Sequence, residues 1–332
     1  MTMARFSFAS LAVYVLLLAV PTTLSADDGR GTLNVVFEND RAANTDRHFT
    51  HGSYASYVTK RGGAPDWAVA LGEAVPGRLM DKGVDRIGFV LGQDMFTPDD
   101  IGRFDLIEGD RPYAGWLYTG MKLIAEEREN LQRLELDVGV VGPASRADDT
   151  QAIVHEILGV QRPNGWDNQL DNEPGAVLIY ERKWRRIDTL PLTDIEIALI
   201  PHATAALGNI YTFAAGGASL AIGQELEASW GPARIFPGLR GSDFFEAGER
   251  LHWQLFMGGQ VRAVARNIFL DGNTFADSHS VDKEPVVGDL QFGAELAYDR
   301  YRLAFTQVVR TREFENQTEN DLFGAITLSV QF

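Results

Sequence analysis

The sequence predicts an all-β protein, an antiparallel transmembrane β-barrel of 12 strands with a short helix in an extracellular loop. Three observations lead to this prediction. Apolar and polar side chains alternate along most of the chain, which suits strands that face lipid on one side and a polar interior on the other. The number of such segments is even, as in single-chain bacterial barrels. No stretch after the N-terminal segment is long and apolar enough for a membrane-spanning helix.

Residues 1–26 are predicted to be a signal peptide. Arg5 supplies a positive charge, residues 11–20 form a short apolar run, and residues 24–26 offer a cleavage position ahead of Asp27. The alternative is an uncleaved membrane anchor, although a bilayer span takes about 20 apolar residues. Residues 27–332 then form a single barrel domain in the bacterial outer membrane.

The composition limits the kinds of partner. The chain has 30 Lys and Arg residues against 46 Asp and Glu residues, a net charge of −16. Proteins that bind duplex nucleic acid normally present basic surfaces, so we expect no nucleic-acid partner. The acidic surface is compatible with divalent cations. The chain has no cysteine, which is ordinary for an exported bacterial envelope protein of this size.

The alternation is clearest near the C-terminus. Between residues 253 and 261 the odd-numbered positions are mostly apolar, and the even-numbered positions are mostly polar or glycine. Residues 290–298 and 322–332 repeat the pattern. A soluble β-sandwich or barrel would explain this alternation equally well. It explains less well a last strand that ends on an aromatic residue, Phe332, because a terminal aromatic is typical of the assembly signal of outer membrane proteins.

The alternating segments give the predicted strands, which are 32–38, 52–60, 86–95, 115–126, 131–141, 175–186, 193–204, 211–224, 251–264, 286–298, 300–310 and 322–332. With both termini on the periplasmic side, the odd-numbered connections are extracellular. They are 39–51, 96–114, 142–174, 205–210, 265–285 and 311–321. Segments 61–85 and 225–250 are long for periplasmic connections. They are either inserted elements or signs of an error in the strand count.

One extracellular segment contains a predicted helix. Ser145 and Asp148 have capping-box spacing, and Gly159 suits a helix end. Gln151 and His155 are four residues apart and therefore share a helix face. Such a helix could lay its apolar stripe over the barrel rim or lipid and hold His155 towards the lumen. The alternative is a helix whose histidine is merely solvated.

The first hairpin gathers oxygen donors. Asn39 and Asp40 lie at the end of the first strand and Thr50 near the start of the second, so the hairpin brings them together. Carboxylate, amide, hydroxyl and main-chain oxygens are the ligands that Ca²⁺ prefers. Zinc fits less well, because the histidines are scattered and cysteine is absent. The alternative is an Asx-rich turn whose side chains bond their own backbone.

Several motifs occur together and in order over residues 33–186. They are END followed by TDRHFTHG, GQDMFTP, DRPYAGW, GVVGPAS followed by Q and VH, and GWDNQLDNEPG. This set resembles the lipid A 3′-O-deacylase family of outer membrane proteins. The resemblance implies a twelve-stranded barrel and a calcium-dependent hydrolase that faces the outside. Its substrate would be lipopolysaccharide, from whose lipid A it releases the acyloxyacyl chain esterified at the 3′ position.

The resemblance also implies roles for individual residues. His155 matches the general base, with Gln151 beside it on the helix. Asn39, Asp40 and Thr50 match the active-site and calcium region, with Asp40 as the central ligand. The expected mechanism is attack by a water molecule that His155 deprotonates, while calcium polarises the acyl carbonyl.

Two positions depart from the family pattern. A lysine is expected after the TP turn, where Arg103 is the nearest match and a possible donor to substrate. An acidic residue is expected shortly after the histidine, where Gln161 stands, with Glu156 and Glu173 as alternatives. The full set of calcium ligands is therefore open.

Other functions remain as alternatives. A calcium-using outer membrane phospholipase would need a serine near His155, and Ser145 is a poor candidate by geometry. A passive pore or structural barrel would need none of these residues. Arg47 and Arg111 could meet lipid A phosphates or form intramolecular ion pairs. We expect a monomer surrounded by outer membrane lipids.

Overall fold

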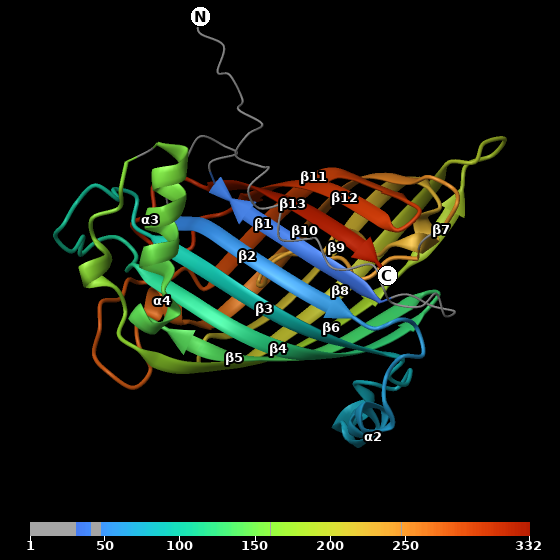
Figure 1. The fold of residues 1–332 in the computed structure, drawn as a ribbon, viewed down its shortest axis with the longest axis horizontal. Helices are drawn as coiled ribbons and strands as arrows, with labels where there is room; N and C mark the ends of the chain where they lie inside the picture. Colours follow the sequence, from blue (N-terminus) through green and yellow to red (C-terminus); the bar gives the residue numbers. More distant parts are fainter. Residues whose placement is uncertain (1–30, 41–47, 160, 247) are drawn as a thin grey trace, which may run out of the picture.

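The protein is a closed antiparallel β-barrel (Figure 1). The computed structural model describes residues 31–40, 48–159, 161–246 and 248–332. The predicted signal peptide and Arg47 lie outside the described residues. No helix within the described ranges is long and apolar enough to cross a membrane.

Each strand pairs with its sequence neighbours, except that β6 and β7 do not pair with each other, and β1 pairs with β13 to close the barrel. The strands are β1 (Thr32–Asn39), β2 (His48–Val58), β3 (Arg86–Thr97), β4 (Ala114–Glu127), β5 (Asn130–Val141), β6 (Glu173–Trp184), β7 (Arg186–Thr189), β8 (Glu196–Gly208), β9 (Tyr211–Gln224), β10 (His252–Asn267), β11 (Val286–Tyr298), β12 (Tyr301–Arg310) and β13 (Asp321–Gln331). Both β6 and β7 pair with β8, so together they occupy one strand position in the barrel wall. In the described part of the chain the barrel thus has twelve strand positions, which confirms the predicted fold.

Several predicted strand boundaries differ from the structure by a few residues, and two of these differences change a loop that bears on the site. Strand β2 begins at His48 instead of residue 52, so Thr50 and His51 belong to the strand and not to the loop. Strand β8 continues to Gly208, which shortens its connection to β9 to residues 209–210. Both changes extend strands at the same end of the barrel, because pairing with their neighbours continues past the clearly alternating residues.

The predicted division into outward and inward faces is confirmed. In β10, Leu255, Met257 and Val261 are exposed on the outer wall, whereas Gln254 and Arg262 are buried inside. Strands β11 and β13 follow the same pattern. The outer wall is therefore largely apolar, as a transmembrane barrel requires. The inward positions carry most of the buried polar and charged side chains, together with an apolar cluster that includes Val36, Val90, Trp116 and Phe236.

The two ends of the barrel differ. One end, called here the α3 end, carries the long loops with helices α3 (Ala147–Leu158) and α4 (Ile268–Asp271). The opposite end, called the terminal end, holds the start of β1, the end of β13 and the short turns between β4 and β5 and between β11 and β12. Helix α2 (Asp66–Ala74) lies beside the outside of the barrel at the terminal end (Figure 1).

Segment 225–251 is an inserted element that fills the lumen, and we call it the plug. It leaves β9 at the terminal end, contributes the short helix η6 (Leu226–Ala228), and returns to β10. Its residues bond to inward side chains around the barrel. Arg234 makes a two-pronged ion pair with Glu38 of β1, at 2.9 and 2.8 Å, and Thr327 of β13 donates to the carbonyl of Ala233 at 2.8 Å.

The deeper part of the plug joins a buried charge cluster on β4 and β5. Asp243 lies 2.5 Å from the Lys122 ammonium and 3.5 Å from the Arg133 guanidinium, while Arg240 bonds Glu135 at 2.7 Å. All five side chains are almost completely buried. A buried charge is tolerated only when it is paired and hydrogen-bonded, so wall and plug depend on each other.

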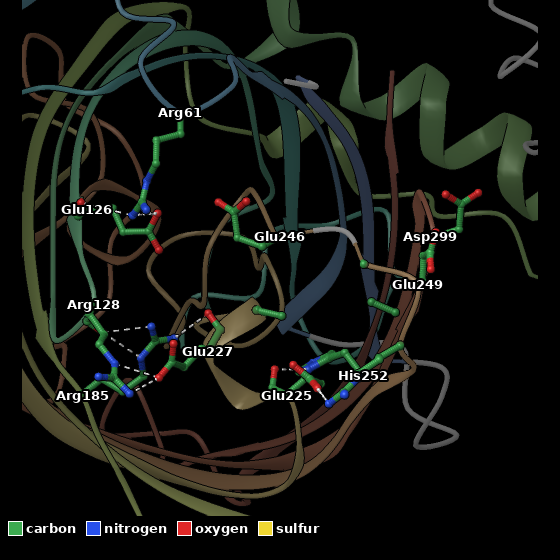
Figure 2. A pocket seen from close by; sticks show the side chains of 14 residues that line it. Arg61, Glu126, Arg128, Arg185, Glu225, Glu227, Glu246, Glu249, His252 and Asp299 are labelled. Carbon is green, nitrogen blue, oxygen red and sulfur yellow. Dashed lines mark hydrogen bonds and ion pairs between the residues drawn. The ribbon is translucent and has the colours of Figure 1, made fainter. Parts of the chain in front are cut away.

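A cavity of about 620 Å³ lies where the plug enters at the terminal end (Figure 2). Figure 2 shows Arg128, Arg185 and Glu227 on one side of it. Arg128 pairs with Glu227 at 2.5 Å, and Arg185 donates to the main-chain carbonyls of Leu226, Glu227 and Ser229 at 3.1 to 3.3 Å. These contacts fasten the beginning of the plug to the wall, at the end opposite the predicted site.

Removing the Asp243 carboxylate should destabilise the barrel. In Asp243→Ala, Lys122 and Arg133 keep their charges but lose a buried counter-ion, which typically costs about 3–5 kcal/mol. Urea unfolding in phospholipid vesicles, followed by tryptophan fluorescence, measures the loss. The double variant Lys122→Met/Asp243→Ala should lose less than the sum of the single variants, because it removes both charges. A single Asp243→Ala variant as stable as wild type would contradict the role given to the plug.

Candidate functional site

Helix α3 lies against the outer wall of the barrel, over β3 and β4. Gly115, at an outward position of β4, leaves room for it, because a Cβ atom there would come within 2.3 Å of Ser145 Oγ and Ala147 Cβ. Gln93, at an outward position of β3, donates to the carbonyl of Ser145 at 2.7 Å. The expectation that the helix holds His155 towards the lumen is therefore wrong, since α3 packs on the side of the wall away from the lumen.

The predicted helix is present, but its predicted N-terminal cap is wrong. Ser145 is buried in a preceding turn, and its hydroxyl donates to the carbonyl of Gly142 at 2.6 Å. Arg146 is the N-cap residue and makes no side-chain capping bond. The predicted end is confirmed, because Gly159 caps the helix with a left-handed φ of 66°.

Gln151 anchors α3 to the loop that follows it. The indole Nε1 of Trp166 donates to Gln151 Oε1 at 2.7 Å, and both side chains are buried. Trp166 also packs against Tyr113, with ring centroids 5.0 Å apart, and these rings cover Met95 on the outer wall. Gln151 thus fixes the distance and rotation of the helix relative to the wall.

His155 lies one turn further along the same helix face and is 3 % exposed. Its Nδ1 atom is 2.5 Å from the main-chain carbonyl oxygen of Gln161. Because a carbonyl can only accept, Nδ1 carries the hydrogen, and in the neutral ring Nε2 is the nitrogen with the lone pair. Residue Gln161 orients the histidine through its backbone, which needs no acidic side chain at that position.

The strand-end residues meet as predicted, where β1 and β2 pair. Asn39 is opposite His51, and its Nδ2 group donates to the carbonyl of Thr50 at 2.6 Å. That carbonyl lies where the pairing of β2 with β3 shifts between Phe49 and His51. The Thr50 hydroxyl is 2.6 Å from the hydroxyl of Thr97. Asp40, the next residue after β1, is buried.

The strand register connects the two groups of residues. A single row runs across the outer wall through Asn39, His51, Met95 and Gly115. The last two residues of this row lie beneath α3 and its loop. The structure therefore brings Asn39, Asp40 and Thr50 together at one end of the row. It brings Gln151 and His155 together over the other end, on the same outer wall.

Arg103 belongs to the same end of the barrel but not to the buried part of the site. Its side chain is exposed in the loop that follows β3. The carbonyls on either side, of Gly102 and Phe104, accept bonds from Asn164 and Asn168 at 3.0 and 2.7 Å. The Arg103 loop is therefore fixed to the loop that orients His155.

Three polar residues of the outer wall were not predicted as site residues from the sequence. His51, Ser53 and Gln93 occupy outward positions that a lipid-facing strand normally fills with apolar side chains. His51 Nε2 lies 2.6 Å from Ser53 Oγ. The signal was present in the alternation of β2, but it became readable only once the strand was known to start at His48.

Two other candidates serve the loops. The carboxylate of Glu173 accepts bonds from Asn209 at 2.8 Å and from the main-chain nitrogen of Thr274 at 2.6 Å. Arg111 is buried and pairs with Glu313 at 3.3 Å. Burial raises the pKa of Glu313, but the guanidinium groups of Arg310 and Arg111 outweigh it and hold this pKa below its usual range. Arg111 is thus an intramolecular ion-pair partner.

The oxygen donors near Asp40 fit calcium in kind. Asp40 offers a carboxylate, Asn39 an amide oxygen and Thr50 a hydroxyl and a carbonyl. Among the residues that the structure describes, no group of three or more His, Asp and Glu side chains could hold a metal ion. A calcium ion, with about six to eight oxygen ligands, would therefore depend largely on neutral oxygens and water.

Comparisons with known proteins agree with this architecture. A family model described as "Outer membrane protein LpxR" matches residues 11–332. Among solved structures, LpxR from Salmonella typhimurium superposes with a TM-score of 0.75 at 19 % identity, covering 91 % of this chain and all of that one. The β domain of the Bordetella autotransporter BrkA gives a TM-score of only 0.43 at 9 % identity, with 92 % of this chain and 100 % of that chain covered. Curated protein sequences gave no match.

Replacing Gln151 tests whether it anchors α3. In Gln151→Ala the buried indole N–H of Trp166 loses its acceptor, which typically costs about 1–3 kcal/mol. The amides of α3 should then exchange with deuterium roughly tenfold faster in hydrogen-exchange mass spectrometry. Gln151→Glu keeps an acceptor oxygen and should exchange more slowly than the alanine variant. Equal protection of α3 in wild type and Gln151→Ala would show that the anchor lies elsewhere.

Proposed function

Because the chain belongs to the LpxR family of outer membrane proteins, we propose that it is a lipid A deacylase. The reaction is hydrolysis of the ester that links the acyloxyacyl chain at the 3′ position. The observation that supports this most is the buried His155, which lies on a helix packed against the outer wall. The main-chain carbonyl of Gln161 fixes its Nδ1–H group. A general base in that place can act on a lipid that stays in the membrane.

The location of the site suits a lipid substrate. The plug occupies the lumen with bonded charges, whereas Asn39, His51 and Ser53 interrupt the apolar outer wall. A lipid could approach this polar strip sideways, with its acyl chains still among the lipids. The short turns at the terminal end are typical of the periplasmic side, so the α3 end would face outside, in the leaflet that contains lipid A.

The proposed chemistry requires one base and one water molecule. Nε2 of His155 takes a proton from water, and the oxygen attacks the acyl carbonyl carbon. The tetrahedral intermediate then expels the alcohol oxygen, which receives the proton from His155. The products are a fatty acid and a lipid A hydroxyl group. Asn39 holds the Thr50 carbonyl and is assigned a positioning role. Exposed Arg103 is assigned to a carbonyl or phosphate of the substrate.

Calcium is part of the proposal. Asp40 would hold it together with oxygens of Asn39 and Thr50, and the ion would supply a positive charge that polarises the acyl carbonyl. Asp40 is the one carboxylate of this donor set. Its charge is therefore the main electrostatic attraction for the ion within the set.

A second candidate rests on the pair His51 and Ser53. Their contact of 2.6 Å has the geometry of a base and a nucleophile, and it lies on the same outer wall. A serine hydrolase of phospholipid would use such a pair. Ser145 does not serve this purpose, because its hydroxyl donates to Gly142 and it lies in the turn before α3, whose stretch from Ala147 to His155 alone spans about 12 Å along the helix axis.

A passive pore is the least supported alternative. The plug places Arg234, Arg240 and Asp243 in the lumen, each bonded to an inward side chain of the wall. An open aqueous path would need these ion pairs to break. The lumen in this structure instead resembles a packed interior, which is consistent with a barrel that works on its outer surface.

Replacing His155 should abolish deacylation without unfolding the barrel. Outer membranes containing His155→Ala should release the 3′ chain at least about a hundredfold more slowly, because general bases typically contribute 10²–10⁴-fold. Mass spectrometry of lipid A measures the release. The matched control Glu156→Gln should keep wild-type activity, because this carboxylate is exposed on α3 and is not among the proposed calcium ligands Asp40, Asn39 and Thr50.

The same assay separates the two candidates. Under the main proposal Ser53→Ala retains deacylation and no acyl–serine forms. Loss of activity in Ser53→Ala, with labelling of Ser53 by a fluorophosphonate and full activity in His155→Ala, would overturn the assignment of His155. Release from phospholipid but not from lipid A would overturn the substrate.

Removal of divalent cations should stop the reaction. A calcium chelator is expected to reduce release of the 3′ chain to background, and added Ca²⁺ should restore it. Asp40→Asn keeps the size of the side chain but removes its charge, so it should raise the calcium concentration for half-maximal activity by tenfold or more. Full activity in chelator, or an unchanged calcium requirement in Asp40→Asn, would argue against a metal held by Asp40.

A further inference from the structure

The connection between β2 and β3, residues 59–85, forms a pad on the outside of the barrel at the terminal end (Figure 1). Ala68 of α2, together with Met80 and Val84, packs against Ile87 of β3 and Leu123 of β4. Both strand residues occupy outward positions, which lipid would otherwise cover. The pad therefore replaces lipid on this part of the wall.

Helix α2 has three different faces. Its residues advance by about 100° each, so buried Ala68 and Gly72 mark the face on the barrel. Trp67 and Leu71, four residues apart, mark an adjoining apolar face and are 53 % and 44 % exposed. Asp66 and Glu73 mark the remaining, acidic face. An exposed tryptophan and leucine beside an apolar wall are unusual for a surface in water.

The apolar face of α2 continues the apolar belt of the barrel. On β3, Phe89 and Leu91 are 49 % and 60 % exposed, between Ile87 under the pad and Met95 under the α3 loop. The eight residue steps from Ile87 to Met95 span about 26 Å along the strand, or roughly 20 Å along the axis of a tilted barrel. That is close to the ~25 Å height of a lipid-facing band, so α2 lies at its border.

We propose that α2 is an interfacial anchor that inserts Trp67 and Leu71 into the periplasmic leaflet of the outer membrane. The partner is a phospholipid surface. Its attraction is apolar, because α2 contains two acidic residues and no basic one. Of the basic residues of the pad, Arg61 and Lys82 are paired with Glu126 and Glu127 at 3.0 Å. Tryptophan suits the boundary between headgroups and acyl chains, and the acidic face then points to water. The anchor fixes the depth of the barrel in the bilayer.

Single cysteines test this directly, since the chain has no cysteine of its own. Leu71→Cys and the control Glu73→Cys are labelled with an environment-sensitive fluorophore and reconstituted into phosphatidylcholine vesicles. At position 71 the emission should shift to the blue and be quenched at least twofold more by lipids brominated near the headgroup than at position 73. Added salt should leave the quenching unchanged, because screening does not weaken apolar insertion.

Two results would overturn the anchor. One is water-like emission with equal, weak quenching at both positions. The other is a blue shift at position 71 that appears in detergent and grows with protein concentration, because a second copy of the chain would then cover this face. Trp67→Cys repeats the test if Leu71→Cys does not fold, as judged by heat-dependent mobility in gels. Neither readout depends on deacylation, so failure of the proposed function leaves the test valid.

Discussion

The ion pairs between the plug and the inner wall are the interaction on which the rest of the structure depends. A barrel with an apolar exterior must direct its polar residues inwards, and here these include Glu38, Lys122, Arg133 and Glu135. Burying such charged groups away from water costs free energy unless each one is paired and hydrogen-bonded. The plug supplies partners of the opposite charge, most clearly in the two-pronged bond between Arg234 and Glu38. Wall and plug therefore specify each other, and the lumen becomes a packed core of paired charges and apolar side chains.

A filled lumen leaves the outer wall as the surface available to a lipid. At the α3 end of this wall, Gly115 lets α3 approach closely, and the bond between Gln151 and Trp166 fixes the helix. His155 is then oriented by a main-chain carbonyl. Polar residues at outward positions of the same wall, such as His51 and Ser53, are costly in lipid unless they serve a bound polar group, which is why they mark the candidate site.

A helix lies over each end of the outer face of strands β3 and β4. Helix α3 covers Gly115 at one end, and the α2 pad covers Leu123 at the other. Between them Phe89 and Leu91 remain exposed. The two helices thus border the part of the wall that suits lipid. Under the proposed function, a barrel held at the α2 end would keep the candidate site at a constant depth in the opposite leaflet, where the ester of a lipid also lies at a fixed depth.

The sequence by itself determined the local structure. It predicted the twelve strand positions, the division of β10 and β13 into inward and outward faces, the helix that ends at Gly159, and the meeting of Asn39 with the Thr50 region. These follow from periodicity and from contacts between chain neighbours. Only the tertiary structure decided that segment 225–251 fills the lumen and that α3 packs on the outer wall of the barrel. It also decided that Ser145 stabilises a turn before the helix and does not cap the helix. The reason is physical. Glu38 and Arg234 are 196 residues apart, and no local pattern records which buried charge will meet which.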